Sequence, residues 1–475
     1  MIVLCGCGVT VSLMHTLVAP LLPEISHTMR LSQDAASWLL TVTMLAGAVC
    51  APVCGRLGDM LGKRRMLAIA LAIMSAGSLL GALSWSFESL LAARMLQGAA
   101  FGVLPLGISI LKDELPAHRV MAGTATMSST LGVGGAIGMP LAGVIAQVMD
   151  WHAVFWAATV VSVLVFALVV LFVPESPVRS GGRFDVVGAL GLAAGLVGLL
   201  LAVSRGGTWG WGSPAVIGLF AGSAVVLTLW AAHQLRVRQP LVDLRTSARP
   251  VVLLTNTATT LVGVGMFASF MLTPLVLQAS TATGYGFGAS VMVAGLCMVP
   301  MGLGMLVFSP LSAKLSARRG AHVTLLAGTL VMLVGNVAQA LLPGNVALLM
   351  AVLMVLSIGT ALCFSAMPTL IMAWVPATET ASANSLNSLL RTIGTSTCAA
   401  IGGTFLAAYP LVVDGAVVPS ATGFRVTFWM AAAASLGAAC LALAVTAVIR
   451  RSARTTAAET EGSGTAAAPA GMLAQ

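Results

Sequence analysis

Charged residues are scarce in this chain. Lys, Arg, Asp and Glu together make up 8 % of its 475 residues, with 23 basic side chains and only 14 acidic ones. About a quarter of the residues of a soluble domain are charged, so this composition excludes an ordinary water-soluble fold. With 58 % hydrophobic residues and a mean hydropathy of +1.01, the sequence indicates an all-α integral membrane protein.

Motifs of catalysis and metal binding are also missing. The eight cysteines lie within apolar runs, with no Cys-x-x-Cys pair and no histidine at ligand spacing, which argues against disulfides and zinc. The chain lacks His-Glu-x-x-His, Gly-x-Ser-x-Gly and phosphate-loop motifs. We therefore expect no enzyme activity, no catalytic residue, no metal and no cofactor. The net charge of +9 is spread over alternate loops, so we expect no nucleic-acid partner.

What fills the chain is a series of apolar runs, each near the roughly 20 residues that cross a bilayer. Their order predicts 14 transmembrane helices arranged 6 + 2 + 6. The first half then occupies 1–174, an inserted pair 175–250, the second half 251–450 and a disordered cytoplasmic tail 451–475. The runs cover 2–22, 37–55, 66–86, 89–111, 120–148, 153–173, 186–204, 214–233, 251–279, 288–311, 322–342, 346–372, 383–412 and 425–449.

The distribution of basic residues predicts the orientation. The first run is interpreted as a helix and not as a signal peptide, because Pro20, Pro23 and Glu24 occupy the place of a cleavage site. With a cytoplasmic N-terminus, 18 of the 23 basic residues lie inside, 3 lie outside, and 2, Arg94 and Arg391, lie within helices. This bias predicts a multi-pass protein of the bacterial inner (plasma) membrane with both termini in the cytoplasm.

A basic, glycine-rich stretch at 55–65 connects the second and third runs. It reads Gly-Arg-Leu-Gly-Asp-Met-Leu-Gly-Lys-Arg-Arg, with Asp59 near its centre. A related stretch at 310–319 follows the second run of the second half. An ungapped alignment places Ser316 opposite Gly62 and no acid opposite Asp59. Two halves of one topology predict a transporter of parallel repeats, with its substrate path between them.

Several motifs follow one another in a fixed order along the first half and the inserted pair. They comprise Gly55, Leu57, Asp59, Gly62, Lys63, Arg64 and Arg65; Arg94, Gln97 and Gly98 on the fourth helix; Gly134, Gly138, Pro140 and Gly143 on the fifth; Trp151 and Phe155; Phe184 to Gly188; and Pro240 to Leu244. This set resembles the major facilitator superfamily, and specifically its fourteen-helix drug:proton antiporters. The resemblance covers essentially the whole chain and implies the major facilitator fold.

The resemblance implies that 55–65 is a gating loop, a cytoplasmic latch that holds the two halves together in the outward-facing state. Asp59 can face the positive end of a helix dipole, and Lys63, Arg64 and Arg65 suit anionic headgroups. An ordinary positive-inside loop is the alternative that charge alone favours.

The Gly/Pro segment of the fifth helix, with Gly134, Gly138, Pro140 and Gly143, resembles a segment associated with exporters rather than importers. The glycines allow close helix packing and the proline can kink the helix. Simple helix packing remains the alternative, and the sequence does not separate it from a role in alternating access.

Arg94 and Arg391 are cations within apolar runs, a costly placement that usually marks a cavity or a partner. Gln97 follows Arg94 by three residues on the same helix face. We take these three residues and His15 as candidates for the substrate or proton pathway. For Arg94 the alternative is a clamp between helices; for Arg391 it is snorkelling toward the helix end.

One expected acid is missing. The resemblance implies an aspartate in the first helix that moves protons and meets cationic drugs, but Met14 stands at that position. His15 beside it titrates near neutrality and is the obvious substitute; a neutral imidazole bonded between helices is the alternative. Since no carboxylate lies in a helix centre, the buried arginines favour neutral or anionic substrates over cations.

We therefore expect a transporter that exports small amphipathic drugs or metabolites by alternating access, as a proton-coupled antiporter. Its partners are a small-molecule substrate, the lipid bilayer and, with coupling still open, protons; we expect it to act as a monomer. Two alternatives stay open: a membrane sensor or scaffold that retains the fold without transport, and a facilitator that protons do not drive. Uptake instead of export also stays open, and only the Gly/Pro segment of the fifth helix argues against it.

Overall fold

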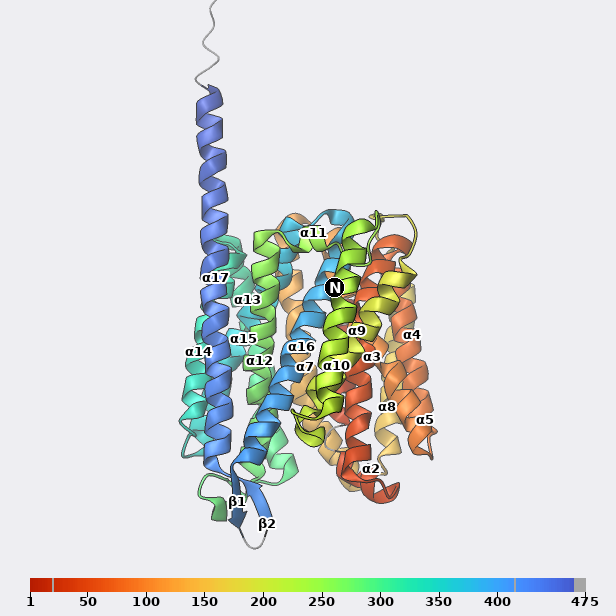
Figure 1. Ribbon diagram of the computed structural model, residues 1–475, viewed down its shortest axis with the longest axis vertical. Coiled ribbons are helices and arrows are strands. Elements are labelled where there is room, and N and C mark those ends of the chain that lie inside the picture. Colours follow the sequence, from red (N-terminus) through yellow and green to blue (C-terminus); the bar gives the residue numbers. More distant parts are fainter. Residues whose placement is uncertain (19–20, 414–415, 465–475) are drawn as a thin grey trace, which may run out of the picture.

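The computed structural model describes the backbone of residues 1–18, 21–413 and 416–464, and the protein is a bundle of long helices (Figure 1). At some positions within these ranges, including Gly143 and Arg454, only the backbone is described. The end of the bundle that carries Lys63, Arg64 and Arg65, at the top of Figure 1, is called the basic end below. The fold belongs to the all-α membrane class that the composition predicts.

Each predicted apolar run coincides with a helical segment. In the first half these are α1 (Ile2–Leu17), α3 (Gln33–Leu61), α4 (Lys63–Ala82), α5 (Phe87–Gln97) continuing through η2 (Gly98–Gly102) into α6 (Val103–Glu114), α7 (Ala117–Val148) and α8 (His152–Phe172), with a short α2 (Leu22–Thr28). The inserted pair is α9 (Val186–Trp209) and α10 (Pro214–Arg236), followed by α11 (Leu244–Ser247). The second half contains α12 (Pro250–Gln278), α13 (Val291–Arg319), α14 (Ala321–Ala340), α15 (Val346–Trp374), α16 (Thr380–Ala408) and α17 (Ala421–Gly464).

Eleven helices within the described residues are long and apolar enough to cross a membrane, and α1 with α2 as one bent span would make twelve. Neither α7 nor α16 is among them. In α16 the physical reason is composition, since Ser, Thr and Asn recur along it and Arg391 lies near its middle. The structure therefore supports about eleven to twelve spans.

The connection between α16 and α17 contains a small β-hairpin, which the sequence interpretation did not predict. Strands β1 (Pro410–Val413) and β2 (Ala416–Pro419) pair antiparallel, with Pro410 opposite Pro419. Valines on both sides of an Asp-Gly pair favour such a hairpin. At the other end of α17 the helix continues to Gly464, so the expected disordered tail begins as helix over 451–464, where alanines favour helix. Residues 465–475 lie outside the described residues.

The predicted gating loop at 55–65 is for the most part not a loop. Residues 55–61 form the last two turns of α3, and 63–65 begin α4. Gly62 alone breaks the helix, with φ +116°, a conformation that residues with a Cβ rarely adopt. The basic side chains are therefore held on helices and not on a mobile connection.

The second half repeats this break with a different register. α13 ends at Arg319 and α14 begins at Ala321, with Gly320 between them at φ +88°. By structural role, Gly320 corresponds to Gly62, whereas the ungapped alignment paired Gly62 with Ser316. The difference of four residues is about one helical turn, which leaves the same helix face aligned and so hides the shift in a sequence comparison.

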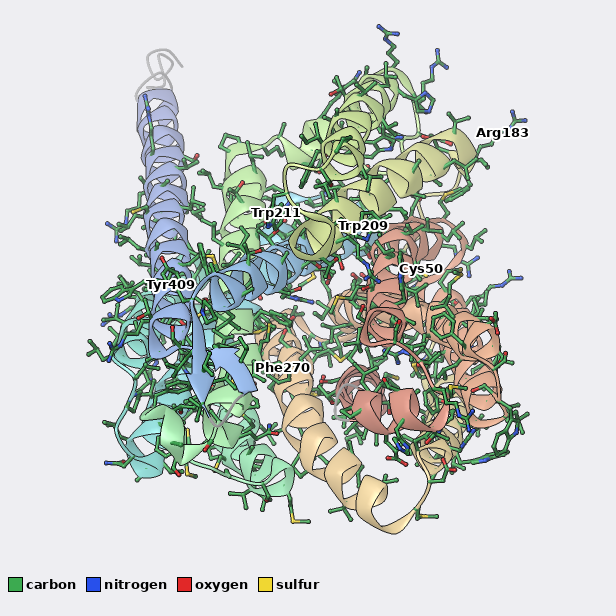
Figure 2. All side chains as sticks on the ribbon, turned by 60° about the horizontal axis from the view of Figure 1, so that its bottom comes forward. Cys50, Arg183, Trp209, Trp211, Phe270 and Tyr409 are labelled. Atoms are coloured by element: carbon green, nitrogen blue, oxygen red, sulfur yellow. The ribbon has the colours of Figure 1, made fainter. Side chains whose placement is uncertain are left out.

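The inserted pair α9–α10 packs against both halves. Near the end opposite to the basic end, the Arg205 guanidinium lies 4.1 Å from the ring centroid of Trp38 on α3. Trp211 Nε1 donates to Thr404 Oγ1 of α16 at 2.9 Å. Figure 2 shows Trp211 and its neighbour Trp209 at the junction of α9 and α10. Arg205 follows the predicted run 186–204 and is one of the three basic residues predicted outside; it is instead buried in the last turns of α9, because the helix extends to Trp209 and Trp38 covers the cation.

Each half has its own apolar core, and α3, α7, α13 and α16 make most of the contact between the halves, with further contacts from α6 and α15. Along this contact small residues let backbones approach closely. A Cβ on Gly302 of α13 would collide with the backbone of Gly132 on α7, and one on Gly55 of α3 would meet Ser385 of α16. The contact between the halves is therefore the surface on which any functional site between them must be built.

Candidate functional site

Asp59 joins the two halves at the basic end. Its carboxylate lies at the first residues of α16, where Oδ1 accepts from the Ala381 amide at 3.1 Å. Oδ2 accepts from the amide and the hydroxyl of Ser382 at 2.8 and 2.6 Å. A carboxylate at this place satisfies free amides and faces the positive end of the helix dipole. An acid of the first half thus caps a helix of the second half.

Lys63 lies beside this cap and is fully buried. Its ammonium donates to Asp113 Oδ2 at 2.5 Å and to Thr380 Oγ1 at 2.9 Å, and Asp59 Oδ1 is 4.0 Å away. Asp113 also accepts from the Ser176 hydroxyl at 2.5 Å. Both carboxylates belong to the same half as Lys63 and compensate its buried charge, while the hydrogen bond to Thr380 is the contact of this ammonium with the second half. We call Asp59, Lys63, Asp113, Thr380 and Ser382 the closure.

Further hydrogen bonds join the two halves. Lys112 Nζ donates to the Met372 carbonyl at 2.7 Å, and the Ser128 hydroxyl to the Phe364 carbonyl at 2.9 Å. Lys112 and Met372 lie in the last turns of α6 and α15, next to the closure, whereas Phe364 lies about two turns deeper in α15. The basic end is therefore the closed end of the seam between the halves.

Three other residues of the predicted gating stretch, Leu57, Arg64 and Arg65, have their contacts in the first half or just after it. Leu57 packs at the edge of the first core. The amides of Arg64 and Arg65 at the start of α4 donate to the two carboxylate oxygens of Glu175, each at 3.2 Å. The Arg64 guanidinium donates to the Val170 carbonyl, and the Arg65 side chain is exposed. Among these basic residues the structure places only Lys63 in the closure.

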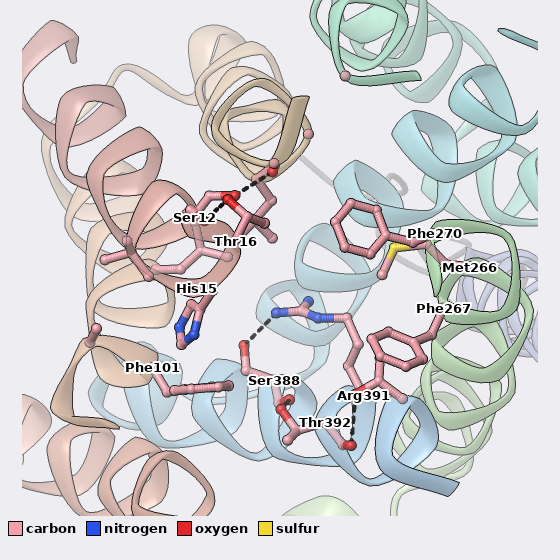
Figure 3. A pocket seen from close by; sticks show the side chains of 18 of the residues that line it. Ser12, His15, Thr16, Phe101, Met266, Phe267, Phe270, Ser388, Arg391 and Thr392 are labelled. Atoms are coloured by element: carbon pink, nitrogen blue, oxygen red, sulfur yellow. Dashed lines mark hydrogen bonds between the residues drawn. The ribbon is translucent and has the colours of Figure 1, made fainter. Parts of the chain in front are cut away.

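A central cavity of about 270 Å³ lies between the halves, beyond the closure. Helices α1, α3, α7, α12, α13 and α16 line it, together with Arg94, Phe101 and Phe364. Nine of its 27 lining residues are phenylalanine or methionine, and Figure 3 shows Phe267 and Phe270 of α12 on one side and Phe101 on the other. Such a cavity suits a small ligand with a large apolar surface.

His15 faces the cavity, whereas Met14 does not. The His15 ring packs edge-on against Phe101, with 4.3 Å between centroids (Figure 3). Met14 is 5 % exposed and belongs to the core of the first half. The position at which the resemblance implies an aspartate therefore points into the protein, and the neighbouring histidine is the titratable group at the cavity wall.

Arg94 is held by its neighbours. Its Nε donates to the Leu39 carbonyl at 3.1 Å and Nη1 to Gln97 Oε1 at 2.6 Å. Gln97 in turn donates to the Ser78 hydroxyl at 3.0 Å. Arg94 thus links α5 to α3 and, through Gln97, to α4, as in the clamp interpretation, while it also contributes to the cavity wall.

Arg391 points into the cavity and does not snorkel toward an end of the bundle (Figure 3). Nη2 donates to the Ser388 hydroxyl at 3.3 Å, one turn earlier on α16. Its Cζ lies 4.9 Å from the ring centroid of Phe364. These are weak partners for a guanidinium with five donor hydrogens, so most of its binding capacity faces the cavity.

The Gly/Pro segment of α7 divides its contacts between two helices. A Cβ on Gly134 or Gly138 would collide with α1, at Ser12 and Thr16. Pro140 instead lies against Gly295 of α13, at 3.2 Å from the ideal Cβ position, and so faces the other half. Gly143 lies outside the described side chains. The two glycines therefore pack the first half internally, and the contact between halves uses other positions.

Several residues of these two regions escaped the sequence interpretation. Thr380 and Ser382 lie more than 300 residues from Asp59, and their one signal is the position of two hydroxyl residues at the start of an apolar run. Asp113 ends the fourth helix, and only its place beside Lys112 marked it. Phe364 carried no signal, because aromatic residues are common in membrane helices. Phe101 did carry one, since it follows Arg94 by seven residues on the same helix face.

The comparisons with known proteins agree with this geometry. Residues 4–186 and 255–473 match the profile of the Major Facilitator Superfamily. The "Uncharacterized MFS-type transporter Rv1877" of Mycobacterium tuberculosis is 30 % identical over 310 residues, which are 65 % of this chain and 44 % of that protein. The chain thus spans less than half the length of that relative. The "Multidrug resistance protein Stp" of M. tuberculosis is 27 % identical over 82 % of this chain and 72 % of its own length.

A solved structure extends the comparison to the fold. The human organic anion transporter MFSD10 superposes with a TM-score of 0.63 at 16 % identity, over 92 % of this chain and 98 % of the other. At this identity the likeness concerns the fold alone. The two-half bundle, the closure at its basic end and the profile match together identify the chain as a membrane transporter, and not an enzyme, that belongs to the Major Facilitator Superfamily.

Proposed function

We propose that the protein exports small amphipathic drugs or metabolites across the bacterial inner membrane by alternating access. One observation carries the proposal: a largely apolar cavity lies between the halves, while Asp59 and Lys63 close the seam at the basic end. The positive-inside rule assigns that end to the cytoplasm, so the closure corresponds to the outward-facing side of the cycle. The name of the relative Stp supports multidrug export.

The proposal includes the full membrane topology. Helices α7 and α16 cross the membrane together with the apolar spans, which gives fourteen helices in the order six, two and six. Both run the length of the seam between the halves, where α7 packs on α13 and α16 on α3. The polar residues of α16 therefore face protein and cavity more than lipid. Both termini then lie in the cytoplasm, and one chain forms the complete cavity as a monomer.

We also propose that protons drive export through His15. Its imidazole is at the cavity wall, and no carboxylate lines the described part of that wall. An imidazole can take up a proton on one side of the membrane and release it on the other when the cavity changes its exposure. A facilitator that protons do not drive is the competing outcome of the experiment on His15.

Export is tested by a susceptibility panel of drugs and metabolites in a strain that lacks its own major efflux systems. The wild type is expected to raise the tolerated concentration of some amphipathic compounds, and Asp59→Asn to lower that gain at equal membrane levels. The control is Glu88→Gln, which neutralises an exposed acid in the first turn of α5, at the end of the bundle opposite to the basic end. A protein that protects against no compound and accumulates none would be a sensor or scaffold.

Coupling is tested in everted vesicles, in which an imposed pH gradient drives accumulation of a compound found in the panel. His15→Ala is expected to abolish the dependence on the gradient, while counterflow of labelled compound without a gradient continues. His152→Ala is the matched control, because this imidazole lies at the end of the bundle against Trp85 and Trp151. Full gradient-driven accumulation by His15→Ala would exclude the proton role of this residue.

A further inference from the structure

The charges around the central cavity all have one sign. Arg94 and Arg391 contribute guanidinium groups to its lining and His15 an imidazole, whereas no Asp or Glu belongs to the described lining. The described acids near the lining residues in sequence, such as Glu24, Glu88 and Glu379, lie in the first turns of their helices. A cationic ligand would thus meet two guanidinium groups in a poorly solvated space without a compensating anion.

The two arginines differ in how many of their guanidinium donors are engaged by protein acceptors. Arg94 is 2 % exposed and donates to the Leu39 carbonyl and to Gln97. Arg391 is half-buried and donates to one hydroxyl, that of Ser388, at the long distance of 3.3 Å. A guanidinium in a membrane interior is stabilised strongly by an anion, and its planar fork matches a carboxylate with two parallel hydrogen bonds. Arg391 is therefore the available anion receptor of the cavity.

The surroundings of Arg391 fix the rest of the ligand. Phe267 and Phe270 of α12 stand beside its side chain (Figure 3), and Met266, Met298 and Met301 line the adjoining wall. Aromatic faces and flexible thioethers accept flat apolar groups of varied shape. A ligand of this space has one anionic group and a compact apolar body.

We propose that the transported compounds are small amphipathic organic anions, whose carboxylate pairs with Arg391 while the apolar body lies among the phenylalanines and methionines. This inference rests on the proposed export function and assigns the substrate class of the same cavity. Arg94 supports the wall and adds positive potential, but it does not hold the ligand. Lipophilic cations are excluded by the same pair of arginines.

Binding to the purified full-length protein in nanodiscs tests the assignment, with three naphthalene probes of nearly equal size. The probes are 2-naphthylacetate, its neutral methyl ester and 2-naphthylethylammonium. For the wild type we expect the carboxylate to bind about tenfold or more tighter than the ester, and the ammonium probe to bind weakest. Arg391→Gln should remove this preference, and Arg391→Lys should retain part of it because it keeps the charge without the fork.

Two controls separate the charge effect from misfolding. Affinity for the methyl ester should stay within about twofold in Arg391→Gln, because the apolar wall is unchanged. Arg236→Gln removes an exposed cation at the end of α10 and should leave the affinities for all three probes unchanged. The proposal is overturned if the carboxylate does not bind the wild type, if the ammonium probe binds as tightly, or if Arg391→Gln keeps the preference for the carboxylate.

The same probes separate this inference from the proposed export function. In everted vesicles the wild type should accumulate the carboxylate in preference to the other two. Accumulation of a probe without preference for the anion would leave export intact and overturn the substrate class. Tight, Arg391-dependent binding of the carboxylate with no movement of any probe would leave the binding site intact and overturn export.

Discussion

The two halves of the molecule share one turn between their second and third helices but differ in the contacts that its residues make. In the first half, Gly62 separates α3 from α4, and the residues around it reach across to α16 through Asp59 and Lys63. In the second half, Gly320 separates α13 from α14 with a similar backbone. The bonds at this second turn stay local, with the Ser316 hydroxyl donating to Thr324.

This difference shows that the repeated backbone and the closure are separate properties. A glycine with positive φ is enough to make the turn, and both halves retain it. The closure needs in addition a carboxylate facing a free helix N-terminus, and only the first half supplies one: by structural role, Ala317 stands where Asp59 does. The asymmetry means that the basic end is held by one half acting on the other.

Among the substitutions at the two turns, Asp59→Ala should reduce the export rate most. It removes three hydrogen bonds to the start of α16, and bonds to a charged group contribute about 1.5–3 kcal/mol each before any rearrangement. We expect the export rate to fall about tenfold or more, because the closed state loses much of its stability. Efflux of a loaded compound from cells measures the rate. Export at the rate of the exposed-site control Glu88→Ala would contradict the role of the cap.

Lys63→Gln should have the second largest effect. The amide keeps a donor toward Thr380 but leaves Asp113 and Asp59 without the buried cation between them. Removing one partner of a buried ion pair costs about 3–5 kcal/mol in general, and separation of the halves relieves part of this cost by hydrating the acids. We expect a several-fold slower export at normal membrane levels. Arg65→Gln changes an exposed cation of the same stretch and is the matched control.

Gly62→Ala and Gly320→Ala should separate the effect of the turn itself from the effect of the closure. Both substitutions force a Cβ into a positive-φ site, which costs about 1–3 kcal/mol. At Gly62 the added Cβ would also lie 2.6 Å from Glu175 Oε1, which accepts from the start of α4, whereas at Gly320 it meets the His322 ring. Thermal unfolding in detergent should show both variants destabilised, but only Gly62→Ala should slow export. Equal loss of export in both would make the turn itself the functional element.

Ala317→Asp should have the smallest effect. This side chain is exposed, so we expect the stability to change by less than about 0.5 kcal/mol. The double variant Asp59→Ala, Ala317→Asp should export as slowly as Asp59→Ala alone, since Ala317 is exposed on α13, whereas the helix start that Asp59 caps belongs to α16, which packs on α3. Restored export would show that an acid on either half is sufficient.

The sequence alone predicted the all-α membrane fold and its helical runs, because apolar length and charge patterns follow from the membrane, whereas the importance of Asp59 for transport stays a prediction. It did not predict the partners of Asp59, since contacts with Ala381 and Ser382 depend on tertiary packing. It assigned 55–65 to a loop because of the glycines in this stretch. In the structure Gly55 and Gly58 are helical, and Gly62 alone separates α3 from α4. The direction of Arg391 was also open, because the helix period fixes a face but not what that face meets.

The central claim is that Asp59 holds the basic end shut, and a distance across that end tests it most directly. His118 and Thr378 are exposed on opposite halves, and spin labels can be attached at both positions in a variant without native cysteines. Double electron–electron resonance in nanodiscs then measures the distance between the two labels. For the parent protein we predict one dominant short distance. Asp59→Ala should add a second, longer population. Identical distance distributions for the two proteins would contradict the account.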